Sequence, residues 1–82
     1  MEFKGTKGRW EINRWGNVFG ENEEVAYMPS LTPKKEKEAN ALLISKAPEM
    51  LEMLKACVKT FELLGMEKPK GIVELIKEAT KL

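Results

Sequence analysis

Histidine, aspartate and glutamine are absent from this chain of 82 residues. All 13 acidic residues are glutamates, and 12 of the 14 basic residues are lysines. Without histidine or aspartate, the usual general bases, catalytic triads and metal-binding clusters cannot be assembled. We therefore expect a protein that is not an enzyme, with no catalytic residues, no metal site and no cofactor.

Cysteine and long apolar runs are also scarce. Cys57 is the single cysteine, which excludes an internal disulfide and fits a reducing compartment. The longest apolar run covers only residues 41–44, whereas a membrane-spanning helix needs roughly 20 residues. The first residues contain no apolar segment of the kind found in signal peptides. We expect a soluble protein that is used inside a cell and has no membrane partner.

Length and charge set two further limits. A chain of 82 residues is long enough for one small domain, so we expect residues 1–82 to form a single domain. The formal net charge is +1, which argues against a protein that coats nucleic acid by charge alone.

The composition changes near residues 29–33 and divides the chain into two parts. Residues 1–30 contain both tryptophans, the single tyrosine and four of the six glycines. Apolar and polar residues alternate over residues 9–13 and 24–28, and residues 18–19 form a short apolar stretch between two turn-like segments. This pattern predicts a three-stranded antiparallel meander in which Trp10 and Ile12 share one face and pack under helices.

Residues 32–82 have the pattern of helices. Thr32 followed by Pro33 predicts a helix start, with Thr32 as the N-cap. One face of this first helix would contain Ala39, Leu42, Leu43 and Ala47.

Pro48 interrupts that pattern and predicts the first turn of a second helix, through either a hairpin or a kink. Gly65 is a good C-cap for this helix. Its apolar stripe contains Met50, Leu51, Leu54, Cys57, Val58, Phe61 and Leu64. A third stripe contains Ile72, Val73, Ile76, Ala79 and Thr80. The fold class that we predict is α+β, a small N-terminal antiparallel β-meander followed by two to three amphipathic helices.

Residues 38–54, EANALLISKAPEMLEML, resemble a segment that is common in short bacteriophage and prophage accessory proteins. Its typical form there is EANAxLIAAAPELLEAL, placed between a small β-rich part and another amphipathic stretch. Ser45, Lys46, Met50 and Met53 depart from this form. The resemblance implies a phage origin but carries no catalytic residue. Small non-enzymatic phage proteins of this kind often act by binding, for example as antagonists of host defence.

Basic and aromatic side chains are interleaved near the N-terminus. Residues 1–20 carry four positive and two negative charges, whereas residues 21–30 carry three negative charges and no positive one. Arginine and tryptophan together can bind a phosphate and stack on a base. A structural role is the competing interpretation, above all for Trp10, because large aromatic residues dominate small cores. The candidate ligand-binding residues are Lys7, Arg9, Arg14, Trp15, Lys34 and Lys35.

A small chain with a thin core often gains stability by self-association. The apolar stripe of the second helix is wide, so we expect a homo-oligomer. The candidate interface residues are Met50, Met53, Leu54 and Phe61.

These observations favour a phage-encoded, non-enzymatic binding protein in the cytoplasm of the infected bacterial host. It would antagonise a host immune process, either by sequestering a signalling nucleotide or by blocking a host defence protein. Protein blockade would use Trp15 and an exposed helix face. Two alternatives stay open: a small nucleic-acid-binding accessory protein, and a structural or assembly protein of the phage particle.

Overall fold

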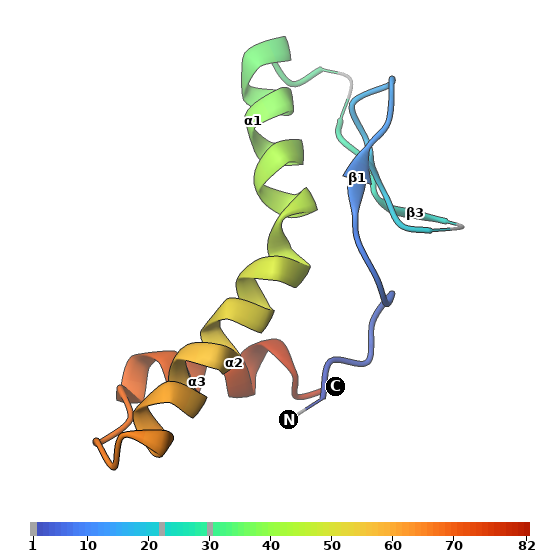
Figure 1. Ribbon diagram of the computed structural model, residues 1–82. Coiled ribbons are helices and arrows are strands. Elements are labelled where there is room, and N and C mark those ends of the chain that lie inside the picture. The colour runs from blue at the N-terminus through green and yellow to red at the C-terminus, as the bar shows by residue number, and fades with distance from the viewer. Residues whose placement is uncertain (1, 22, 30) are drawn as a thin grey trace. The chain divides into compact units, whose positions relative to one another are not determined.

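The computed structural model describes residues 2–21, 23–29 and 31–82. Three short strands are followed by three helices, which confirms the predicted α+β class (Figure 1). The strands are β1 (Glu11–Ile12), β2 (Val18–Phe19) and β3 (Glu24–Ala26). The helices are α1 (Lys34–Ser45), α2 (Ala47–Leu63) and α3 (Lys70–Ala79).

The strands form an antiparallel sheet in the order β1-β2-β3, as the meander prediction required. Ile12 lies opposite Val18, and Glu11 lies opposite Phe19. The pairing of β2 with β3 is irregular, because Val18 lies opposite Ala26 and Phe19 opposite Glu24. One extra residue therefore stands in β3, as in a β-bulge, and increases the local twist. The predicted turn over residues 20–23 includes Asn22, which lies outside the described residues.

The contacts divide the chain into two compact units. The first unit comprises Thr6–Glu49, and the second comprises residues 2–5 together with Met50–Leu82. The border lies within α2 and not at the composition change near residue 30. The expectation of a single domain over residues 1–82 stays a prediction.

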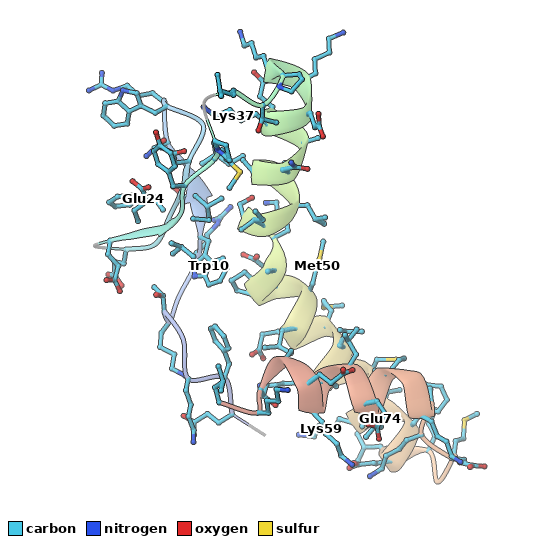
Figure 2. The ribbon with its side chains drawn as sticks, turned by 180° about the vertical axis from the view of Figure 1, so that it is seen from behind. Trp10, Glu24, Lys37, Met50, Lys59 and Glu74 are labelled. Carbon is cyan, nitrogen blue, oxygen red and sulfur yellow. The ribbon has the colours of Figure 1, made fainter. Side chains whose placement is uncertain are left out.

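The core of the first unit lies between the sheet and α1, which packs against β1 and β2 (Figure 1). Val18 and Ala41 are completely buried there, beside Met28. Trp10 packs against this cluster, and its indole N–H donates a hydrogen bond to the carbonyl oxygen of Thr6 at 3.2 Å (Figure 2). The core role of Trp10 is therefore confirmed.

The prediction for Ile12 is wrong, because its side chain is exposed. β1 contains only two residues, and Trp10 precedes it. The alternation that would place residues 10 and 12 on the same face needs a longer regular strand.

The predicted apolar face of α1 is exposed, and it is not the face that packs on the sheet. Ala39, Leu42 and Leu43 are exposed, and the two leucines keep 55% and 61% of their accessible surface. Because α1 carries apolar residues on both sides, its periodicity does not distinguish the inner face from the outer one. Short side chains on the inner face let the helix approach the sheet closely. The residues of this inner face are Ala41, Ile44 and Ser45.

The ends of α1 differ slightly from the prediction. The N-cap is Pro33, with an extended ψ of 141°, in place of Thr32. At the other end only Lys46 separates α1 from α2, and its φ of −92° and ψ of −2° are right-handed helical values. One such residue is shorter than the loop of a helical hairpin, which has about two to five residues. The junction that the sequence left open is therefore a single residue with helical angles and not the loop of a hairpin.

The second unit contains most of α2 and all of α3. Ile76 is buried and five members of the α2 stripe are half-buried, whereas Met50, Leu64 and Ala79 are exposed. Gly65 ends α2 as predicted, with a φ of 67°. Met66 N–H donates to the carbonyl of Phe61 at 2.9 Å, and Gly65 N–H donates to that of Glu62 at 3.1 Å. This pair of bonds is a Schellman motif. The half-buried α2 residues are Leu51, Leu54, Cys57, Val58 and Phe61.

Candidate functional site

Residues 13–17, which we call the Trp15 turn, connect β1 to β2. The side-chain oxygen of Asn13 accepts hydrogen bonds from the backbone N–H groups of Trp15 at 3.0 Å and Asn17 at 3.1 Å. The backbone of Asn13 also exchanges bonds with this turn, donating to Asn17 and accepting from Gly16. Gly16 has a φ of 78°, a left-handed conformation that favours glycine. The turn is thus fixed by its own hydrogen bonds.

Two contacts attach the Trp15 turn to the rest of the first unit. Asn17 is buried, and its Oδ1 accepts a hydrogen bond from the backbone N–H of Met28 at 2.9 Å. Lys37 extends from α1 toward the turn, so that a Cβ atom added at Gly16 would lie 3.6 Å from its Cε (Figure 2). The turn is therefore held by the chain that follows β3, and the Lys37 side chain of α1 lies beside it.

An arginine and a tryptophan are paired on this turn. The guanidinium carbon of Arg14 lies 4.7 Å from the centre of the Trp15 ring, which is cation–π geometry. Trp15 nevertheless keeps 64% of its surface exposed. A large aromatic side chain that is presented to solvent on a hydrogen-bonded turn can enter a pocket on another protein.

A shallow hollow of about 450 Å³ lies beside the turn. Arg9 is its single basic lining residue, whereas Glu11 and Glu21 are acidic. The Arg9 Nε and a carboxylate oxygen of Glu11 lie 3.8 Å apart. Because acidic residues surround Arg9, the hollow does not have the charge that an anion site needs. Its remaining lining residues are Ile12, Asn13, Phe19 and Gly20.

The predicted ligand-binding residues do not share this hollow. Arg9 lines it, whereas Arg14 and Trp15 lie on the turn. Lys34 and Lys35 are exposed in the first turn of α1, and Lys7 is exposed in the segment before β1. All six belong to the first unit. Their joint role in binding a ligand stays a prediction.

The predicted interface residues of α2 differ in their exposure. Met50 and Met53 are exposed, whereas Leu54 and Phe61 are half-buried on the inner stripe. Only the two methionines are therefore readily accessible to a partner, and the interface itself stays a prediction.

Metal-binding clusters and membrane-spanning helices are both absent from the described part of the chain. No group of three or more histidine, cysteine, aspartate or glutamate side chains could hold a metal ion in this part of the chain. No helix there is both long and apolar enough to cross a bilayer.

Sequence reasoning missed the residues that shape the turn and the hollow. Asn13 is half-buried and organises the turn, although it is not among the candidate residues. The signal was present, because an asparagine side chain often bonds the backbone N–H two residues on in a turn. No local signal indicated that Phe19 and Glu21 would line the same hollow as Arg9, because that depends on how the strands pair.

A comparison with protein families gives the chain a context. The sequence model of the family described as Salmonella phage P22 protein Y8K6 matches residues 1–81. No curated protein and no solved structure matches the chain significantly. The match covers nearly the full length, and it agrees with the phage origin expected from residues 38–54. The chain therefore belongs to the family of Salmonella phage P22 protein Y8K6.

Proposed function

We propose that this phage protein is a non-enzymatic binding protein that blocks a host defence protein in the cytoplasm of the infected bacterium. The observation that carries the proposal is the exposed Trp15 side chain on a hydrogen-bonded turn. The residues in contact with the host protein would be Trp15 and Arg14.

The conformation of the turn supports this role. Binding costs free energy whenever loops and side chains must become ordered. A turn that is already ordered before binding therefore loses less conformational entropy when it binds. Asn13 and Asn17 hold the backbone on both sides of Trp15. Tryptophan and arginine are also the residues most enriched among those that dominate binding energy in protein interfaces.

Sequestration of a signalling nucleotide receives less support from the same region. Arg14 already covers one face of the Trp15 ring, which leaves the other face for stacking. Arg9 lies beside Glu11, and a second carboxylate, Glu21, lines the adjoining hollow. Two carboxylates near a phosphate would oppose its binding.

The proposal predicts that Trp15→Ala abolishes capture of the host target. The tagged protein would be expressed in the bacterial host, and captured proteins would be quantified by mass spectrometry. We expect one host protein in stoichiometric amount with the wild type, and at least ~30-fold weaker binding for Trp15→Ala, a loss of about 2 kcal/mol.

Leu31→Ala is the matched control, because Leu31 is 97% exposed and is not one of the turn residues 13–17. Equal capture by Trp15→Ala and Leu31→Ala would contradict the proposal. Native mass spectrometry of the untreated wild type tests the nucleotide alternative. An adduct with a nucleotide's mass that disappears in Arg9→Glu would replace the proposal with sequestration.

A further inference from the structure

The outer face of α1 has an apolar centre with charges at both ends. Leu42 and Leu43 are exposed there, next to the small side chain of Ala39. This face lies opposite the inner face that packs on the sheet, so the first unit does not cover it. The charged residues of the outer face are Lys35, Glu38, Lys46 and Glu49, all of them exposed.

The spacing along this face is that of a helix–helix seam. Lys35, Ala39, Leu42, Lys46 and Glu49 follow one another at alternating intervals of four and three residues. This is the heptad spacing with which one helix packs along another. Lys46 keeps helical backbone angles, so the stripe continues from α1 into the first turn of α2.

The order of the charges indicates how a second copy would pack. In an antiparallel pair related by a two-fold axis at Leu42, Lys35 of one copy lies opposite Glu49 of the other. Glu38 then lies opposite Lys46, and Leu42 contacts its own equivalent. In a parallel pair, each charged residue would lie opposite the same residue of the other copy, so that like charges would face each other. Within the described part of the chain, none of these four charged residues forms an ion pair.

We infer that the outer face of α1 is a self-association surface, on which two copies of the chain form an antiparallel, two-fold symmetric helix pair. The partner is another copy because the face is complementary to itself, as a two-fold interface must be. This surface differs from the one expected on α2, and it does not depend on the Trp15 turn.

The apolar centre is small, so the pair is a weak one. Two leucines and an alanine from each copy form the contact, and exposed ion pairs add little free energy each. We expect a dimer with a Kd of about 10 µM, typical of small interfaces. Sedimentation velocity between about 1 µM and 500 µM covers this range, and the mass should rise from 9.3 kDa to twice that value.

Leu42→Glu tests the apolar centre. It places two carboxylates against each other at the two-fold axis, and we expect the dimer Kd to rise at least about tenfold. Leu75→Glu on α3 is the matched control, because Leu75 is 51% exposed and Leu42 is 55% exposed. A dimer that withstands Leu42→Glu, or a wild type that stays monomeric throughout, would overturn the inference.

A charge exchange tests the antiparallel register and leaves the leucines in place. Lys35→Glu and Glu49→Lys should each weaken the dimer, because each places like charges opposite each other. The double variant restores opposite charges and should return the wild-type Kd. A double variant no better than either single variant would exclude this register. Because all these side chains are exposed, circular dichroism should show unchanged helix content in every variant.

Discussion

At the scale of single residues, buried polar groups decide where the Trp15 turn lies. Asn17 is 7% exposed and its amide oxygen satisfies the backbone N–H of Met28. The sequence places Asn17 in a turn and Asn40 in a helix, but it does not show that the Asn17 side chain is buried while that of Asn40 is exposed. Turn residues can be identified from local chemistry, but the partner of a buried amide is set by the tertiary fold.

Asn17→Ala should therefore destabilise the protein much more than Asn40→Ala. Loss of the amide leaves the Met28 N–H buried without an acceptor, which costs about 1–3 kcal/mol. Asn40→Ala removes no described hydrogen bond and raises helix propensity, so its stability should change by less than ~0.7 kcal/mol. Urea denaturation compares the two variants, and equal midpoints would contradict the role assigned to Asn17.

Two glycines should respond in opposite directions to alanine. Gly16 has a φ of 78°, which is unfavourable for alanine, so Gly16→Ala should lower stability by about 1 kcal/mol. Gly71 lies in α3, and a Cβ there would meet no atom within 4 Å. Gly71→Ala should raise stability by about 0.5–1 kcal/mol. Thermal unfolding measures both, and a stabilised Gly16→Ala variant would contradict the turn geometry.

At the scale of elements, the helices could be predicted better than their contacts. Gly65 and the stripe through Ile76 were identified correctly, since each is a strong local signal. The inner face of α1 could not be identified, because Leu42 and Leu43 indicate one face while the sheet packs on the other. The close approach of α1 needs a small side chain, and Ala41 provides it.

Ala41→Leu should lower the stability of the protein, because it would force α1 away from the sheet. Ala41 is completely buried against the sheet, so a larger side chain must displace its neighbours. Overpacking of this kind costs about 1–3 kcal/mol. Ala56→Leu is the control, because Ala56 is exposed on α2 and should tolerate leucine. Chemical denaturation of both variants provides the comparison; an unchanged Ala41→Leu midpoint would be incompatible with the inner face described here.

At the scale of the whole molecule, the fold presents three surfaces with different chemistry. The Trp15 turn offers an aromatic side chain on a fixed backbone. The hollow beside it has mixed charge. The outer face of α1 is complementary to itself. The α+β class and the order of its parts could be predicted from composition and periodicity, whereas the hollow could not, because it depends on strand pairing. Family membership supplies the phage origin.

The central claim is that the Trp15 turn contacts a host protein during infection. The most direct test places a photo-crosslinking phenylalanine derivative at position 14, next to Trp15, illuminates infected cells and identifies the crosslinked proteins. The same derivative at the exposed Leu31 serves as control. We predict one crosslinked host protein from position 14 and none from position 31. No host protein from position 14, or the same proteins in equal amount from both positions, would contradict the claim.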